Sequence, residues 1–428
     1  MRSSGGSSHV VCEEGLRAVE KLNEQNGLPL KGMRVIALEN MLSGPYASMM
    51  LADAGAEVIK VEPPRTGEIG RAVGPPLRWD GDQVGGMFLR VNRHKKSVTI
   101  NLKKPEGIAI VRELISQSDV LLENFRPGVL RRLGLDWETL HQENPRLIHA
   151  SISGFGDPEV APSQYADRPA VDIVVQAMSG LMDMVGDSAD GYPLWLGNPL
   201  CDLVAGMVAA YAIALALLRR QVTGLGARLD VALYDVAIAM NERVFTSQAI
   251  SGERLTRGQG HAGTAPWDSF RARDGYFAVG VVSDAMWKEL CRVIGREGLG
   301  SDPDFAAGPE RVRRQREIKA IIETWAADRT CRDVCSALVA AGVPAGPVWG
   351  AGEVLSSSHV VSRGLFVEVA QGDGPAVPVV GPPFRFAGSD ALKRGEVPGL
   401  GQHTGDVLGR FLGYDQKRLN DLRAAGVI

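Results

Sequence analysis

The sequence predicts an α/β fold in which the first part of the chain forms a doubly wound parallel sheet. Short apolar, β-branched runs alternate with segments of helical periodicity from residue 33 onward, and this alternation is typical of βαβ units. The loops around these strands are rich in arginine, lysine and glycine. Because ligands of doubly wound sheets bind at the carboxyl ends of the strands, these loops are the first candidates for a functional site.

The opening βαβ unit has clear boundaries. We expect a buried strand in "MRVIALEN" (33–40), a helix in "SGPYASMMLADAG" (43–55) and a second buried strand in "AEVIKVEPP" (56–64). Ser43 is a favourable N-cap residue for the helix, and Gly55 is a favourable residue for its end. The turn between strand and helix reads "ENMLSGP" and lacks the GxGxxG pattern of dinucleotide-binding folds. A nicotinamide or flavin dehydrogenase is therefore the weaker interpretation.

The alternation of strands and helices continues to residue 156. A proline opens the next predicted helix, as proline does at the first position of many helices. The predicted elements are a strand at 96–102, a helix at 105–118, and strands at 119–125 and 146–156.

Composition indicates an ordinary globular chain of enzyme size. Its 428 residues are 45% hydrophobic and 23% charged, with a net charge of −3, so the bulk charge gives no reason to expect nucleic acid or an anionic membrane as a partner. The five scattered cysteines include no CxxC pair, and no group of His, Cys, Asp and Glu has metal-ligand spacing. The start of the chain, "MRSSGGSSHV", lacks the apolar segment of a signal peptide. We expect a cytoplasmic protein without a metal and with a partly disordered N-terminal extension over residues 1–30.

The longest apolar run, residues 203–218, predicts a buried core helix. It is shorter than the roughly 20 residues of a bilayer-crossing helix, so we expect no membrane span. Its alanines and glycines allow close packing. Asp202 stands at the entrance of the helix, where an acid either caps free N–H groups or is stabilised as an anion by the helix dipole. Arg219 and Arg220 close the segment and complement the negative end of the dipole.

Basic residues gather near the ends of the predicted strands. Beside backbone N–H groups, such residues suit a ligand that carries phosphate, and solvated surface charge is the alternative for each of them. The residues are Arg65, Arg71, Arg93, Lys95, Lys96, Arg126, Arg131 and Arg132.

Several long motifs follow one another through residues 30–428. They read "GMRVIALENMLSGPYASMMLADAGAEVIKVEPPRTGEIGR", "NRHKKSVTINLKKPEG", "DVLLENFRPGVLRRLGL", "NPRLIHASISGFG" and "GLGQHTGDVL". In sequence and in order they resemble the class III CoA-transferase family, the CaiB/BaiF type. Only the N-terminal extension lies outside the resemblance.

The resemblance implies an architecture. The family has a large Rossmann-like domain built from both chain ends and a smaller α+β domain between them, and two chains interlock as a homodimer. We therefore expect the first part of the large domain at 31–225, the small domain at 226–345 and the return to the large domain at 346–428. The implied substrates are an acyl-CoA and a carboxylic acid, with no tightly bound cofactor.

The resemblance also implies which residues contact coenzyme A. Asn124 and Phe125 match contacts with pantetheine or adenine, and two of the basic residues match phosphate contacts. Where the family often has an arginine after the second strand, this chain has Pro63, and a nearby arginine is the substitute. The residues assigned to CoA binding are Met41, Arg65, Arg71, Lys95, Asn124, Phe125 and Arg132.

Asp202 matches the catalytic carboxylate of the family. The implied reaction begins when Asp202 attacks the thioester carbonyl of an acyl-CoA and forms a mixed anhydride with release of CoA thiolate. The thiolate then attacks the aspartyl carbonyl and leaves an enzyme-CoA thioester, and the acceptor acid reverses these steps. A helix cap is the alternative role for Asp202.

A glycine-rich segment, "TRGQGHAGTAPW" (256–267), is a candidate source of oxyanion donors. Gly258 and Gly260 are the residues assigned to this role, and Gly263 and His261 lie in the same loop. Formyl-CoA transferases carry a longer glycine run at this place. A flexible linker is the alternative.

Val171 separates two chemistries within the resemblance. In the α-methylacyl-CoA racemases a histidine at this position is one of the two bases that move the α-proton, and valine cannot accept a proton. We therefore favour CoA transfer over an acyl-CoA racemase or epimerase. The missing GxGxxG pattern and the basic loops at the strand ends oppose the third interpretation, a non-catalytic Rossmann-type binding protein. We expect Asp172 to raise the pKa of Asp202 or to orient it, with a solvated loop acid as the alternative.

Three residues bear on the substrate. Formyl-CoA transferases have a glutamine at the position of Leu42 and an aromatic residue near Arg71, where this chain has Ala72 and Val73. These differences disfavour formate or oxalate and favour a larger or partly apolar acid, including a dicarboxylate held by an arginine.

Overall fold

The structure is a computed structural model that describes residues 28–186, 188–252, 254–255, 257–258, 260–261, 263–387 and 394–428. The chain divides into two compact units. Unit 1 contains the residues up to Gly180 together with Leu196–Asn241 and Ser362–Ile428, and unit 2 contains Leu181–Trp195 and Glu242–Val361. The expected N-terminal extension lies outside the described residues up to residue 27.

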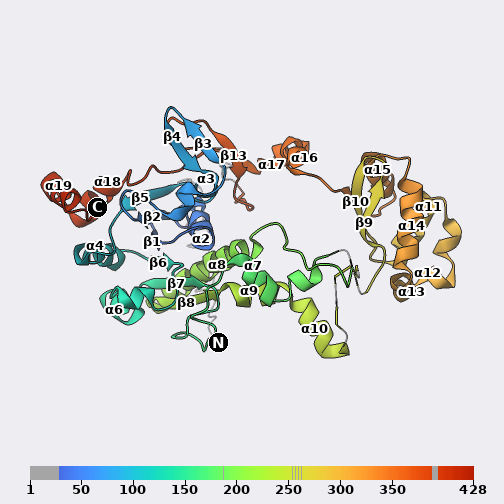
Figure 1. Ribbon diagram of the computed structural model, residues 1–428, viewed down its shortest axis with the longest axis horizontal. Helices are drawn as coiled ribbons and strands as arrows, with labels where there is room; N and C mark the ends of the chain where they lie inside the picture. Colours follow the sequence, from blue (N-terminus) through green and yellow to red (C-terminus); the bar gives the residue numbers. More distant parts are fainter. Residues whose placement is uncertain are drawn as a thin grey trace, which may run out of the picture. The chain divides into compact units, whose positions relative to one another are not determined.

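Unit 1 is built on a six-stranded sheet with the order β5-β2-β1-β6-β7-β8 (Figure 1). Every neighbouring pair is parallel, so the doubly wound parallel sheet is confirmed. The central strands are buried on both faces, which explains their apolar sequences. The strands are β1 (Arg34–Leu38), β2 (Glu57–Glu62), β5 (Lys95–Thr99), β6 (Val120–Glu123), β7 (Ile148–Ser153) and β8 (Ala227–Ala232).

Helices cover both faces of this sheet (Figure 1). A core of aliphatic side chains joins one face to α4 (Pro105–Ser116), α6 (Trp137–Glu143), α18 (Thr404–Leu412) and α19 (Gln416–Ala424). On the other face lie α2 (Ser43–Asp53) and α8 (Leu200–Thr223), followed by α9 (Leu233–Met240). Both ends of the chain thus contribute to unit 1, as expected.

The expected domain boundary at 225/226 is wrong. Strand β8 pairs with β7 from Ile148↔Ala227 to Ser153↔Ala232 and completes the large sheet. Residues 226–241 therefore belong to unit 1. The boundary at 345/346 is also displaced, because β11 (Ala345–Pro347) crosses it and pairs with β10 (Gly275–Gly280) inside unit 2.

Smaller elements complete unit 1 beside the sheet. A hairpin and a short helix follow β2, and a second small sheet forms near the C-terminal part of the chain with the order β13-β12-β14. These elements are the 3-10 helix η1 (Ile69–Ala72), β3 (Pro76–Trp79), β4 (Asp82–Gly85), α3 (Gly86–Val91), α5 (Val129–Arg132), α7 (Asp172–Met178), β12 (Phe366–Ala370), β13 (Val377–Val380) and β14 (Arg394–Glu396).

Unit 2 is an α+β unit with an antiparallel sheet of order β11-β10-β9. Its core forms around Trp287, Phe277 and Phe270, which are almost fully buried. Its remaining strand and main helices are β9 (Trp267–Ala272), α10 (Glu242–Ser251), α11 (Asp284–Val293), α12 (Pro303–Ala306), α13 (Gly308–Arg313), α14 (Gln315–Ala326), α15 (Cys331–Ala340) and α16 (Ala351–Ser356).

Helix α8 is the central helix of unit 1. Among the described helices it is the one long and apolar enough to cross a bilayer by length and composition. One of its faces is buried and lies against α2, β7 and β8, while Tyr211, Leu218 and Val222 on the rest of its surface are exposed. A Cβ added to Gly206 would lie 2.8 Å from the Ser43 carbonyl oxygen, so the small residues of α8 let α2 approach closely.

Arg220 binds the C-terminal end of α8 to the sheet. These contacts are additional to the expected interaction of Arg220 with the helix dipole. Its side chain is buried, Nη2 lies 2.8 Å from Asp119 Oδ1, and Nη1 donates to the Arg146 carbonyl at 3.1 Å. We expect Arg220→Met to lower the free energy of unfolding by about 2 to 4 kcal/mol, because the Asp119 carboxylate and the Arg146 carbonyl would each lose a charged hydrogen-bond donor. Urea unfolding measures this change. The exposed neighbour supplies the control, since Arg219→Met should change stability by less than about 0.5 kcal/mol, and equal effects would contradict the assignment.

Candidate functional site

The loop between β1 and α2 is held by Asn124, which follows β6. Asn124 Oδ1 accepts the Asn40 N–H at 2.8 Å, and its Nδ2 donates to the Asn40 carbonyl at 2.8 Å. Strands β1 and β6 are parallel neighbours, so their carboxyl ends meet at this edge of the sheet. The Asn of the "ENF" motif therefore shapes the loop that leads to α2.

Met41, in the same loop, has a left-handed backbone conformation with φ of 65°. This conformation is unfavourable for a residue with a side chain and persists where the surroundings enforce it. Here the Met41 N–H donates to Glu68 Oε2 at 2.9 Å, and Glu68 is buried. The Met41 side chain is partly exposed at the strand end.

Ser43 connects this loop to Asp202. The expected N-cap role of Ser43 is wrong, because the N-cap of α2 is Leu42 and no described side chain caps the helix. The Ser43 hydroxyl instead donates to the Asp202 carboxylate. Asp202 lies in the first turn of α8, so the close approach of α2 and α8 brings two helix N-termini to one carboxylate. Both helix dipoles favour a negative charge there.

Asp172 provides the cap of α8 that Asp202 does not provide. The N-cap position of α8 is Pro199, and Asp172 Oδ1 accepts the N–H groups of Cys201 at 2.8 Å and of Asp202 at 3.4 Å. Gln176, one turn later in α7, donates to Asp172 Oδ2 at 2.5 Å and to the Asn198 carbonyl at 3.0 Å. Asp172 is thus a buried, positioned acid and not a solvated one.

Burial raises the pKa of Asp202 to about 6, and repulsion from Asp172 adds to this shift, while the hydrogen bond from Ser43 opposes it. A poorly hydrated carboxylate that still ionises near neutral pH is a stronger nucleophile than a fully solvated one. Asp202 therefore combines the two properties that attack on a thioester requires.

Lys95 does not occupy the position of a phosphate contact. Its side chain is fully buried, and Nζ donates to Glu39 Oε1, the Pro45 carbonyl and Asn92 Oδ1, each at 2.8 Å. Lys60 lies beside it, 3.4 Å from Glu39 Oε1 and 3.4 Å from Glu68 Oε1. The expected phosphate contact is therefore at odds with this geometry: Lys95 belongs to a buried ionic cluster beneath the β1–α2 loop.

The other residues assigned to CoA binding divide into two groups. Arg71 is held internally, since it binds both Glu62 oxygens at 2.6 and 2.7 Å and lies over the Phe88 ring. The Phe125 N–H donates to Glu123 Oε2 at 2.7 Å, and burial raises the pKa of Glu123 to about 7. Exposed side chains at the strand ends belong to Arg65 and Arg132, with Phe125, Asn124 and Met41 partly exposed beside them.

Gly258 and Gly260 lie in unit 2, whereas Asp202 lies in unit 1. Both glycines have positive φ, 74° and 66°, which suits a tight loop. Three residues of the segment 256–267, at positions 256, 259 and 262, lie outside the described residues. His261 accepts the Gly263 N–H at 3.1 Å and lies beside Trp267.

His149 is buried in β7, and burial together with nearby Arg228 lowers its pKa to about 4. It is therefore neutral at physiological pH, and its ring lies near that of Trp137 in a tilted arrangement. Over the described residues, no three His, Cys, Asp or Glu side chains form a group that could hold a metal ion.

Sequence reasoning missed three contributors to this site. The sequence predicts only a helix cap for the hydroxyl of Ser43, and the candidate residues from the sequence do not include Gln176 or Glu68. The spacing of Gln176 one helical turn after Asp172 is a signal that could have indicated their contact. The hydrogen bond from the Met41 N–H to Glu68 joins residues 27 positions apart, and no local sequence pattern predicts it.

Comparison with known proteins identifies the family of this chain. The family described as CoA-transferase family III matches residues 30–404. A succinate–glutarate CoA-transferase of Agrobacterium fabrum is 37% identical over 384 residues, which cover 89% of this chain and 95% of that protein. The mouse succinyl-CoA:glutarate CoA-transferase is 33% identical over 401 residues, 94% of this chain and 90% of that protein.

Two further similarities extend the comparison. An acetyl-CoA:oxalate CoA-transferase of Acetobacter aceti is 37% identical over 364 residues, 85% of this chain and 90% of that protein. The crystal structure of a CaiB/BaiF family protein from Brucella suis superposes with a TM-score of 0.79 at 32% identity, covering 90% of this chain and 99% of that one. The chain therefore belongs to CoA-transferase family III.

Proposed function

We propose that this CoA-transferase moves coenzyme A from an acyl-CoA to a dicarboxylic acid through covalent intermediates on Asp202. The observation that carries the proposal is the environment of Asp202: a half-buried carboxylate with a raised pKa, bonded by Ser43 at the meeting point of two helix N-termini. These features suit a nucleophile better than a surface acid or a helix cap.

The reaction balances without water or any cofactor. The Asp202 carboxylate attacks the thioester carbonyl and expels CoA thiolate, and the thiolate attacks the aspartyl carbonyl of the anhydride and expels the donor acid. The acceptor carboxylate then attacks the aspartyl thioester, expels CoA thiolate again and forms a second anhydride. Attack of the thiolate on the acyl carbonyl of this anhydride releases the new acyl-CoA and restores Asp202.

The substrate class rests on the relatives and on Leu42. The relatives are named for succinate and glutarate, for mesaconate and for oxalate, which are all dicarboxylic acids. Leu42 is buried beside the start of α2, and we propose that an apolar residue at this position disfavours the smallest, fully polar acids. We propose succinyl-CoA as a donor and an acceptor acid larger than oxalate.

The exposed side chains at the strand ends are the proposed CoA surface. Arg65 and Arg132 supply positive charge for phosphate, and Met41, Asn124 and Phe125 offer contacts to the uncharged part of the cofactor. We further propose that Gly258 and Gly260 provide N–H groups for the oxyanions, and that the protein is a cytoplasmic, interlocked homodimer.

Intact mass measurement tests the covalent step. After incubation with succinyl-CoA and no acceptor, the protein should gain the mass of CoA less one water, because the released succinate carries away one oxygen of the Asp202 carboxylate. Hydroxylamine should remove the CoA from this adduct. The racemase alternative predicts a different result: deuterium from solvent enters the acyl α-carbon and no adduct forms. An unmodified protein after incubation with several acyl-CoA donors would overturn the proposal.

The pKa of Asp202 predicts an acidic limb in the pH profile. The nucleophile must be ionised, so kcat/KM should fall about tenfold per pH unit below pH about 6 and level off above it. Asp172→Asn should move this limb to lower pH, because it removes the repulsion that raises the pKa of Asp202 while the amide oxygen can still accept the Cys201 N–H. The profile of kcat/KM against pH measures both, and a limb that stays in place would contradict the role of Asp172.

A further inference from the structure

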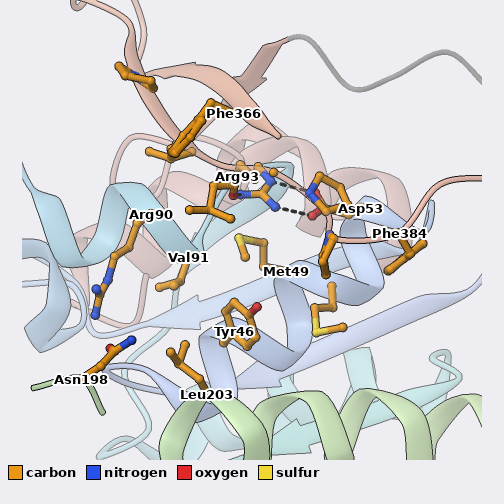
Figure 2. Close-up of a pocket in the computed structure, with 17 residues that line it drawn as sticks. Tyr46, Met49, Asp53, Arg90, Val91, Arg93, Asn198, Leu203, Phe366 and Phe384 are labelled. Carbon is orange, nitrogen blue, oxygen red and sulfur yellow. Dashed lines mark hydrogen bonds and ion pairs between the residues drawn. The ribbon is translucent and has the colours of Figure 1, made fainter. Parts of the chain in front are cut away.

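A cavity of about 390 Å³ opens in unit 1 beside the first turn of α8. Its volume falls in the range of pockets that hold small molecules, about 300 to 1,000 Å³. The wall is formed by α2, α3, the start of α8 and the small sheet that contains β12 and β13 (Figure 2). Apolar side chains make up much of it: Tyr46, Met49, Met50, Leu203, Val379 and Phe384.

The cavity adjoins the proposed nucleophile. Leu203 in its wall follows Asp202 directly, and Tyr46 lies one helical turn after Ser43, the residue bonded to Asp202. Asn198, whose carbonyl accepts from Gln176, also lines the cavity. A molecule whose reacting carboxylate is at Asp202 can therefore extend its hydrocarbon part into this space.

Arg90 supplies a positive charge in the wall of the cavity, on the side where Asn198 lies. Figure 2 shows its guanidinium pointing toward Asn198. Its guanidinium donates to the Met87 sulfur at 3.1 Å, and no carboxylate in the described part of the chain pairs with it. The other arginine of the wall, Arg93, is neutralised by Asp53, with contacts of 2.9 and 2.5 Å.

We propose that this cavity binds the body of the acceptor acid and that Arg90 pairs with its second carboxylate, an inference that rests on the proposed function. Ser43 already donates a hydrogen bond to Asp202, whereas Arg90 comes from α3 and points toward Asn198 (Figure 2). The guanidinium therefore meets the carboxylate that does not react. At about 30 Å³ for each water-sized group, the cavity has room for a hydrocarbon body larger than that of glutarate. The structure assigns a preference for dicarboxylic acids with a longer or apolar-substituted chain.

The test compares acceptors of increasing length with succinyl-CoA as donor. For the wild type we expect kcat/KM to be higher with adipate and pimelate than with glutarate. Arg90→Met should raise KM for the dicarboxylates by roughly 10- to 100-fold, the effect of losing one charge-assisted hydrogen-bonded pair, while kcat and the KM for hexanoate stay within about threefold. Arg90→Lys should retain most of the wild-type KM because it keeps the charge.

Two further variants separate the cavity from a general effect. Met50→Trp fills the cavity and should lower the use of pimelate more than that of glutarate. Arg78→Met, at an exposed arginine of β3 outside the cavity, should change neither. Equal loss of hexanoate and adipate in Arg90→Met, or no dependence on chain length in wild type and Met50→Trp, would overturn the cavity assignment. If the CoA adduct still forms in that case, only the cavity assignment is wrong and the proposed CoA transfer stands. If the adduct does not form, the proposed function is wrong as well.

Discussion

Asp202→Asn is expected to abolish the hydroxylamine-sensitive CoA adduct and to lower kcat by at least about 10³-fold, since loss of a covalent nucleophile typically costs this much or more. The amide keeps the size and the hydrogen bond with Ser43 but cannot attack a thioester. Intact mass and steady-state kinetics measure the two effects. Circular dichroism and urea unfolding should show a folded protein, because the carboxylate is not the cap of α8.

Ser43→Ala is the matched variant for this experiment. It keeps the nucleophile and removes the hydrogen bond that lowers the pKa of Asp202, so the adduct should still form and the acidic limb of kcat/KM should move to higher pH. This direction is opposite to the one expected for Asp172→Asn. Normal turnover or a CoA adduct in Asp202→Asn would remove Asp202 from the mechanism.

Lys95→Met is expected to lower the free energy of unfolding by about 3 to 5 kcal/mol, because removal of one partner leaves a buried charge uncompensated. Glu39 would lose the ammonium at 2.8 Å and keep Lys60 at 3.4 Å and the Ser48 hydroxyl at 2.8 Å. Burial lowers the pKa of Lys95 to about 8, which shows how little water reaches the ammonium. Urea unfolding measures the loss, and KM for the acyl-CoA should change little in the fraction that remains folded.

The adjacent lysine provides the control. Lys96 is partly exposed and pairs with Glu57 at 3.0 Å and with Asp406 at 3.5 Å, so Lys96→Met should cost only about 0 to 1 kcal/mol. If Lys95→Met keeps wild-type stability and strongly raises KM for acyl-CoA, the buried structural role is wrong. The phosphate contact that the resemblance implies would then be the correct assignment for Lys95.

The sheet of unit 1 could be predicted strand by strand because its strands are buried on both faces and read as continuous apolar runs. Helix α8 was also predictable from its apolar run, although the structure extends it to 24 residues. Strand β8 was not, since its burial is partial and its sequence, "ARLDVA", carries an arginine and an aspartate. Pairing with β7 decides its place, and that pairing joins segments about 80 residues apart.

The same distinction holds for the site. From the sequence, Asp202 was recognisable as the one acid at the mouth of an apolar helix, and Asn124 as part of a long family motif, because motif and helix position are local properties. The partners of each charged side chain were decided only by the tertiary structure: Lys95 is buried against Glu39, Asp172 caps α8, and Ser43 meets Asp202. Whether a charge faces solvent, a ligand or another charge depends on desolvation and on neighbours brought together across the sheet, and those neighbours are distant in the chain.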